Sequence, residues 1–233
     1  SMLGGRLGFV DGASHITRRG LGFEITRGNG IEITGGNDVL VAGCTIRNIG
    51  KIGAIIHGGF HNGIISCDIH GTGDGGIVLE GGNRSTLTPA GNFAKNNNIG
   101  DYSRWVRTYR PAVRISGVGN SAANNLIHDA PHTGILLSGN DHAVEYNVFR
   151  DICRETGDVG ACYIGRDWTM RGNVIRFNIF RNIRGPGAGG ARAVYLDDLA
   201  SGTTVYGNSF RNVTYGVIIG GGRDNTVENN VFV

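Results

Sequence analysis

The sequence predicts an all-β fold, a parallel β-helix (solenoid) of about eight to nine coils. The first indication is a recurring phrase, Asn, any residue, then Ile or Phe, which begins at Asn97, Asn125, Asn147, Asn178, Asn208 and Asn230, with Cys44 and Cys67 in the same position earlier. Successive occurrences lie roughly 22 to 31 residues apart, which is the range of solenoid repeats. An amide that returns to one place in every coil can hydrogen-bond along the stack, as Asn ladders do between stacked parallel strands.

The second indication is a short strand in each repeat, in register with the first phrase. Alternate positions are almost always Ile, Val or Leu, and no stretch has a sustained helical period. The predicted strands begin at Gly30, Ala54, Gly76, Ala112, Gly134, Ala161, Ala193 and Gly216. A third indication is the 42 glycines, which suit corners with positive φ, beside only 4 prolines. Short strands and Gly-rich corners at this repeat length are typical of a parallel β-helix.

The 233 residues are expected to form one domain, since a solenoid grows by adding coils. We expect residues 1–29 to be an N-terminal coil or cap and residues 30–233 to be regular coils, the whole being a fragment of a longer protein. Because solenoid ends need covering, homo-oligomerisation through the open ends is a further expectation. Insertions are expected near residues 81–110, 154–160 and 185–192, and such insertions often build a binding face.

Charge and hydropathy exclude some partners. The formal charge of +3 is small and not clustered, so no nucleic-acid partner is indicated. No apolar run approaches the ~20 residues of a membrane span, so no membrane partner is indicated either. The four cysteines match no zinc spacing, and we interpret them as buried structural residues. No metal site and no cofactor are predicted.

Acidic, basic and aromatic residues gather around the insertions. Acid, base and aromatic groups in consecutive coils are typical of a carbohydrate site. With the strands aligned, Tyr163 and Tyr195 lie side by side on the outer face, and Asp197 points outward next to Gly165. Asp158 precedes the same strands. Two carboxylates about 5 to 10 Å apart across a groove are what glycoside hydrolysis requires.

The runs His128–His132, Gly139–His142, Glu155–Asp158, Gly165–Trp168 and Tyr195–Asp198 resemble bacterial right-handed parallel β-helix proteins, and among them glycoside hydrolase family 141. Members of that family act on plant cell-wall glycans as fucosidases or xylanases. The resemblance implies that the catalytic carboxylates are Asp158 and one of Asp197 and Asp198. It also implies an extracellular or periplasmic protein that binds a polysaccharide or oligosaccharide. Asp167 is a further catalytic candidate, and the candidate substrate-binding residues are His132, Glu155, Arg166, Trp168, Tyr163, Tyr195, Arg114 and Trp105.

Several of these residues also have a structural interpretation. Asp167 can instead pair with Arg166 or Arg171 at a corner, and Trp105 and Trp168 can cover the core beneath a loop. His132 and His142 can be buried corner residues, an interpretation that we favour for His142. Asp129 can shape a turn, as Asp often does before Ala-Pro, and Asp141 and Asp224 are interpreted as structural.

Three functions stay open. The first is a glycoside hydrolase with two Asp carboxylates acting on a plant or algal polysaccharide. The second is a polysaccharide lyase on a uronate glycan, with Arg114 or Arg166 as base and Ca²⁺ held by Asp158, Asp197 and Asp198. The third is a non-catalytic glycan-binding or structural fragment, because a fold alone does not select among these functions.

Overall fold

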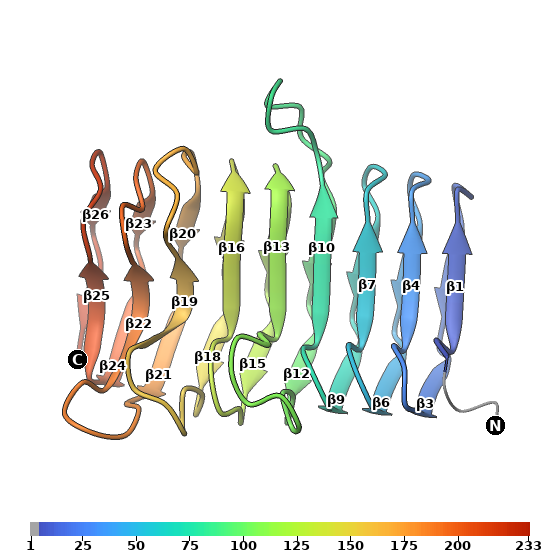
Figure 1. Cartoon of the computed structure of the whole chain (residues 1–233), viewed down its shortest axis with the longest axis horizontal. Coiled ribbons are helices and arrows are strands. Elements are labelled where there is room, and N and C mark those ends of the chain that lie inside the picture. Colours follow the sequence, from blue (N-terminus) through green and yellow to red (C-terminus); the bar gives the residue numbers. More distant parts are fainter. Residues whose placement is uncertain (1–4) are drawn as a thin grey trace.

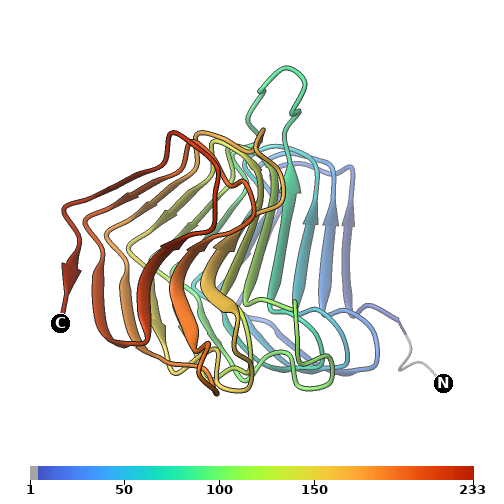
Figure 2. The same ribbon diagram turned by 60° about the vertical axis from the view of Figure 1, so that its left-hand side comes forward.

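The computed structural model describes residues 5–233, and every regular element in that range is a β-strand. Figure 1 shows nine coils stacked side by side along one axis, and Figure 2 shows the same stack turned to expose its last coils. Each coil contributes one strand to each of three nine-stranded parallel sheets. The predicted fold class and the eight to nine coils are confirmed. Within the described range there is no helix of the length and apolar character needed to cross a membrane.

The first sheet, here called sheet A, contains the strands that the Ile/Val/Leu alternation predicted. Its strands are β1 (Gly8–Asp11), β4 (Ile31–Thr34), β7 (Ala54–His57), β10 (Ile77–Gly81), β13 (Val113–Val118), β16 (Ile135–Asn140), β19 (Val159–Ile164), β22 (Ala191–Leu196) and β25 (Tyr215–Ile219). One face of these strands is buried in the core and the other points outward.

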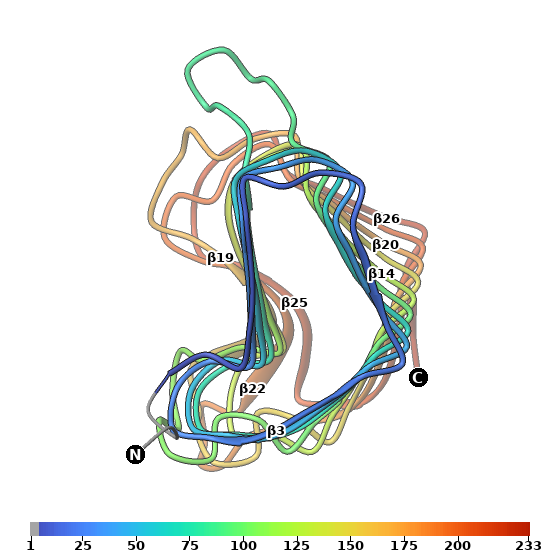
Figure 3. The same ribbon diagram turned by 90° about the vertical axis from the view of Figure 1, so that its right-hand side faces the viewer.

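Sheets B and C complete each coil (Figure 3). Sheet B consists of β2 (Thr17–Arg19), β5 (Leu40–Ala42), β8 (Gly63–Ile65), β11 (Phe93–Lys95), β14 (Ser121–Ala123), β17 (Ala143–Glu145), β20 (Val174–Arg176), β23 (Thr204–Tyr206) and β26 (Thr226–Glu228). Sheet C consists of β3 (Gly22–Thr26), β6 (Thr45–Ile49), β9 (Asp68–Thr72), β12 (Asn98–Gly100), β15 (Leu126–His128), β18 (Val148–Arg150), β21 (Ile179–Ile183), β24 (Ser209–Val213) and β27 (Val231–Phe232).

The predicted Asn ladder lies between sheets B and C. Its carboxamides are buried, except for the half-buried one of Asn230, and each accepts from the backbone N–H of the preceding coil, as Asn147 Oδ1 does from Asn125 at 2.9 Å. The same oxygen accepts from Asn125 Nδ2, also at 2.9 Å. Cys44 and Cys67 continue the ladder toward the N-terminus, because Cys44 N–H donates to Cys67 Sγ at 3.4 Å. All four cysteines are free and buried, which agrees with their structural interpretation.

A second ladder, which the sequence analysis missed, lies at the corner between sheets A and B. It contains Asn62, Asn92, Asn120, His142, Asn173 and Asn225. His142 is buried in this stack, where Nδ1 accepts from Asn120 N–H at 3.1 Å and Nε2 lies 3.2 Å from the Ser138 carbonyl. The buried structural interpretation of His142 is therefore confirmed.

The expected single insertion near residues 81–110 is wrong. Strands β11 and β12 divide it into two separate segments, residues 82–92 after sheet A and residues 101–112 before it. The first segment is the loop that rises above β10 in Figure 1. The other two insertions, near 154–160 and 185–192, also precede sheet A. Longer corners therefore flank both edges of sheet A, as the end-on view in Figure 3 shows.

Residues 8–26 form a complete first coil, since β1, β2 and β3 pair with β4, β5 and β6. This is the coil expected over residues 1–29, of which residues 1–4 lie outside the described range. The buried rings of Phe149, Phe180 and Phe210 and the exposed ring of Phe232 in the last coil lie one above another, with centroid separations of 4.6, 5.1 and 4.9 Å. These rows of identical side chains hold the coils in register, because a one-residue slip would turn them outward.

Candidate functional site

The outward face of sheet A presents two parallel columns of side chains. Strand register defines the first column as Phe9, Glu32, Ile55, Val78, Arg114, Leu136, Tyr163, Tyr195 and Ile218. The second column, two residues further along each strand, includes Asp11, Thr34, His57, Glu80, Ser116 and Ser138, and Asp197 occupies the same position after β22. Tyr163 and Tyr195 are therefore neighbours, as predicted, and Arg114 lies two coils from Tyr163.

The two tyrosines join the two leading carboxylate candidates. Their rings meet edge to face with centroids 5.6 Å apart. The Tyr163 hydroxyl donates to Asp197 Oδ2 at 2.9 Å, and the Tyr195 hydroxyl donates to Asp158 Oδ1 at 3.3 Å. Burial first, and the hydrogen bond to Asp197 second, raise the pKa of Tyr163 to about 12. Burial and Asp197 likewise raise the pKa of Tyr195, so both phenols remain protonated donors at neutral pH.

Asp158 is also held by a fixed cation. The Arg192 guanidinium lies between the rings of Tyr195 and Tyr215, at 4.8 and 5.4 Å from their centroids. Its Nη1 is 3.4 Å from Asp158 Oδ1. The Arg192 side chain is only 16% exposed, whereas that of Asp158 is 80% exposed. A rigid cation therefore positions a carboxylate that is open to solvent and to a ligand.

Asp197 is placed by its neighbour in the preceding coil. A Cβ on Gly165 would lie 2.8 Å from the Asp197 carbonyl oxygen and 3.0 Å from its Cβ. Glycine at position 165 therefore leaves the room that Asp197 occupies, and Asp197 lies next to Gly165, as predicted. Asp198 lies next to this group and forms an exposed ion pair with Arg166, with 3.7 Å between Nε and Oδ2. The phenol of Tyr163 makes the largest contribution to raising the pKa of the Arg166 guanidinium.

Asp167 has a structural role that differs from both expected pairings. Its Oδ1 accepts from Thr169 N–H at 2.8 Å, and its Oδ2 lies 3.3 Å from Nη1 of Arg84. The expected pairing with Arg166 or Arg171 is wrong, since Arg166 pairs with Asp198 and Arg171 pairs with Asp224 at 2.5 Å. Hydrogen bonds from Thr169, followed by Arg84, lower the pKa of Asp167. Asp167 therefore anchors the loop at residues 82–92.

Other candidates lie at the corner before sheet A. His132 is buried, and burial lowers its pKa to about 4, so it is neutral at pH 7. Its Nδ1 accepts from Tyr109 N–H at 3.4 Å. Glu155 forms a paired hydrogen bond with Arg107, whose Nε donates to Oε2 at 2.9 Å, and this bond lowers the pKa of Glu155. Asp129 binds His128 and Arg154.

The two tryptophans do not join the Asp158–Asp197 group. Trp105 lies over Gly50 and Gly73 near the N-terminal coils and is 69% exposed. Trp168 is 61% exposed and lines a shallow hollow with Leu199 and Arg223 beyond the ends of the sheet A strands. Neither ring covers the core, so that structural interpretation is wrong for both. The structure thus brings together Asp158, Asp197, Tyr163 and Tyr195, with Arg166 and Asp198 alongside.

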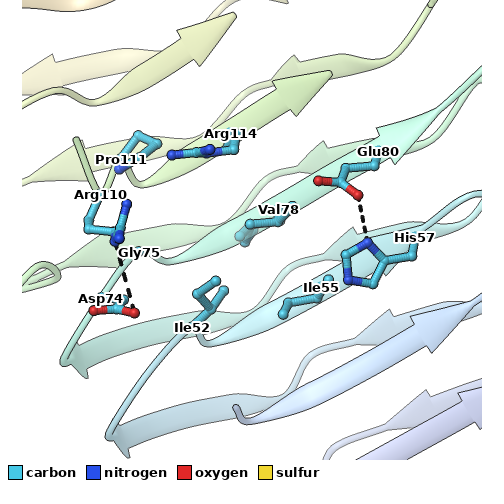
Figure 4. Close-up of a pocket in the computed structure, with 11 residues that line it drawn as sticks. Ile52, Ile55, His57, Asp74, Gly75, Val78, Glu80, Arg110, Pro111 and Arg114 are labelled. Atoms are coloured by element: carbon cyan, nitrogen blue, oxygen red, sulfur yellow. Dashed lines mark hydrogen bonds and ion pairs between the residues drawn. The ribbon is translucent and has the colours of Figure 1, made fainter. Parts of the chain in front are cut away.

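A hollow of about 330 Å³ lies over β7, β10 and β13, further along the same outward face (Figure 4). Of its polar residues only Arg114 was predicted from the sequence, and four were not: His57, Asp74, Glu80 and Arg110. Extending the strand alignment to the earlier coils would have found His57 and Glu80, because they occupy the second outward column. Within residues 5–233, no three His, Cys, Asp or Glu side chains converge to hold a metal ion.

Solved structures of similar shape share little sequence with this chain. A glycoside hydrolase aligns with a TM-score of 0.64 and 15% identity over 87% of this chain and 38% of its own. A mannuronan C-5 epimerase A-module from Azotobacter vinelandii aligns with a TM-score of 0.63 and 13% identity over 94% of this chain and 65% of its own. A tailspike protein of an E. coli bacteriophage, solved in complex with a pentasaccharide, aligns with a TM-score of 0.55 and 15% identity over 97% of this chain and 47% of its own.

This chain therefore spans less than two thirds of each of these three structures. No curated protein matches the sequence. The family description "Right handed beta helix region" matches residues 9–149 and 111–233. Because these two matches together cover nearly the whole chain, the protein belongs to the right-handed β-helix family.

Proposed function

We propose that this protein is a carbohydrate-active β-helix protein, and specifically a glycoside hydrolase that acts on a plant or algal polysaccharide. The observation that carries the proposal is the pair of carboxylates, Asp158 and Asp197, at the two ends of the Tyr163–Tyr195 pair. Glycoside hydrolysis needs one carboxylic acid to protonate the leaving oxygen and a second carboxylate to attack the sugar or activate water.

The surroundings of the pair suit a sugar ring. Tyr163, which is partly exposed, offers aromatic surface against the C–H face of a pyranose, and the nearly buried Tyr195 supports it through the edge-to-face contact. Arg166 and Asp198 lie beside the pair and carry exposed charges that can bind sugar hydroxyl groups. The similar structures include a glycoside hydrolase and a tailspike protein solved with a pentasaccharide, which supports a glycan as the ligand.

The first experiment is a screen of the chain against pectic, xylan and algal glycans, with reducing ends and ultraviolet absorbance measured together. New reducing ends without absorbance support the hydrolase. The variants Asp158→Asn and Asp197→Asn should then each lower turnover by at least about 100-fold, the scale of acid–base catalysis. Asp68→Asn, an exposed carboxylate on sheet C, is the matched control and should keep full activity. Full activity in both site variants would contradict the proposal.

A polysaccharide lyase is the second candidate, and the hollow over β7, β10 and β13 is the observation that favours it. Arg114 lies there on the outward face and can act as the cation or base that uronate elimination requires. Absorbance from an unsaturated uronate product, lost in Arg114→Gln, would favour the lyase. The absence of both new reducing ends and absorbance with every glycan would favour a non-catalytic glycan-binding protein. An extracellular or periplasmic location and a homo-oligomer through the solenoid ends stay predictions.

A further inference from the structure

The hollow over β7, β10 and β13 has an apolar floor and two polar walls (Figure 4). Ile55 and Val78 form the floor; both point outward from sheet A, yet they are only 5% and 8% exposed. Longer side chains on either side therefore shield Ile55 and Val78 from solvent. His57 and Glu80 form one wall, joined by a hydrogen bond of 2.6 Å between Nδ1 and Oε2.

The opposite wall carries the two arginines, Arg110 and Arg114, and Asp74. Both guanidinium groups donate to the Tyr109 carbonyl oxygen, at 3.3 Å from Arg110 and 3.1 Å from Arg114. Arg110 also lies 4.0 Å from Asp74. Figure 4 shows these three side chains across the floor from His57 and Glu80.

The charges of the hollow leave one cation without an acidic partner. Glu80 is paired with His57, and Asp74 is paired with Arg110. Within residues 5–233, Arg114 has no carboxylate at ion-pair distance, and its one hydrogen bond is to a backbone carbonyl. A guanidinium carries five N–H donors, so most of those on Arg114 remain available. The free donors of a half-buried arginine are suited to bind a carboxylate through two parallel hydrogen bonds.

The hollow and the Asp158–Asp197 site lie along the same outward face of sheet A. Arg114, Leu136 and Tyr163 are successive neighbours in one outward column. Two strand spacings separate Arg114 from Tyr163, which is about 10 Å along the stack. A short oligosaccharide lying along the column would therefore contact both places.

We propose that the hollow is a sugar subsite that takes a uronic acid residue. The C–H face of its ring lies on Ile55 and Val78, its hydroxyl groups bind Glu80 and His57, and its carboxylate binds Arg114. This inference rests on the proposed function, because the same glycan reaches the carboxylate pair. It makes the substrate an acidic, uronate-containing glycan. The cavity lies in the size range of protein sites that bind small molecules, about 300 to 1,000 Å³.

The test is calorimetric binding to the full chain carrying Asp158→Asn, the variant expected to slow turnover by at least about 100-fold. The probes are trigalacturonate and trimannuronate, each compared with its carboxyl-reduced neutral counterpart. We expect at least one uronate trisaccharide to bind about tenfold or more tighter than its neutral form, a difference of about 1.4 kcal/mol. Adding Arg114→Gln should abolish this preference, whereas Arg19→Gln, an exposed arginine on sheet B, should leave it unchanged.

Equal binding of the charged and neutral probes, or no binding of either uronate, would overturn the subsite, as would an unchanged preference in Arg114→Gln. Tighter binding of a sulfated trisaccharide than of both uronates would also overturn it, since the ligand group would then be a sulfate ester. The two proposals fail separately. Cleavage of a neutral glycan without any uronate preference keeps the hydrolase and removes the subsite. A uronate preference with full turnover in Asp158→Asn and Asp197→Asn keeps the subsite and removes the hydrolase.

Discussion

Tyr163 and Tyr195 lie in neighbouring coils with their rings edge to face, and their hydroxyls bind two different carboxylates. Tyr163 donates to Asp197, which directly follows β22. Tyr195 donates to Asp158, which directly precedes β19. The ring contact, with centroids 5.6 Å apart, fixes the positions of the two phenols relative to each other. The tyrosine pair therefore fixes the positions of the two carboxylates relative to each other.

Gly165→Ala should lower kcat/KM by at least about tenfold, since small misplacements of reacting groups carry losses of this size or greater. The new methyl group would lie 2.8 Å from the Asp197 carbonyl oxygen, so the backbone that carries Asp197 must shift. Steady-state kinetics on the glycan found in the screen measure the effect. Gly22→Ala is the control, because no atom lies within 4 Å of its added Cβ. Wild-type kinetics in Gly165→Ala would show that the position of Asp197 is not limiting.

Asp167→Ala should leave most activity in place, in contrast to the Asp158 and Asp197 variants. Asp167 binds Arg84 and Thr169 at a corner, and exposed ion pairs of this kind stabilise by about 0.2–1 kcal/mol. Faster proteolysis within residues 82–92 should accompany the change, because Arg84 would lose one of its anchors. Activity as low as that of Asp197→Asn would instead make Asp167 part of the catalytic group.

Asn147→Leu should destabilise the protein by at least about 1–3 kcal/mol, because the buried N–H of Asn125 would lose its acceptor. The variant also breaks the bonds from Asn147 Nδ2 to Ala122 and Asn178. Urea denaturation measures the change. Asn98→Leu, an exposed position on sheet C, should alter stability by about 0.5 kcal/mol or less. Equal effects in the two variants would argue that the ladder adds nothing beyond surface bonds.

His142→Asn should reduce the loss of folding stability that occurs between pH 6.5 and about pH 4. Burial lowers the pKa of His142 from 6.5 to about 4, so the unfolded state binds a proton that the folded state rejects between these two values. Stability therefore falls as the pH drops from about 6.5 to about 4, and this penalty vanishes above pH 6.5. Asn at this position matches Asn120 and Asn173, so stability at pH 7.5 should change little.

Urea denaturation at pH 7.5 and pH 4.5 gives the comparison for His142→Asn. The exposed His70 of sheet C provides the control, and His70→Asn should keep the wild-type difference between the two pH values. An unchanged difference in His142→Asn would show that other groups cause the acid sensitivity, of which the buried His132 is the first candidate because burial lowers its pKa to about 4 as well.

The fold was predictable because its signals repeat. Each strand of sheet A has the same alternation, and the ladder between sheets B and C returns with the same apolar partner two residues later. The asparagines of the ladder between sheets A and B also stand two residues before an apolar residue, but that residue varies between Ile, Ala and Val, and His142 and Thr203 interrupt the asparagines. Strand β11 was not predicted because its three residues, with one pointing inward, carry almost no periodic signal, whereas β12 follows the Asn97 phrase and was included in the insertion because long corners lie on both sides of β11 and β12.

The site was predictable only where strand alignment determines proximity. Tyr163 and Tyr195 follow from register, and so does the space that Gly165 leaves for Asp197. The contact between Arg84 and Asp167 joins residues 83 positions apart through two irregular loops, and no periodicity relates them. The stacking of Arg192 between two tyrosines likewise depends on side-chain conformations that the repeat does not specify.

The spacing between successive ladder residues varies from 22 to 31, while the three sheets keep their register throughout. The extra residues are confined to corners that border sheet A. The corners that border sheet A can therefore change during evolution without changing the three sheets. A longer corner alters the surface beside sheet A, and it disturbs neither the two ladders nor the row of phenylalanine rings. The same separation makes these corners the natural places to graft new loops onto this solenoid.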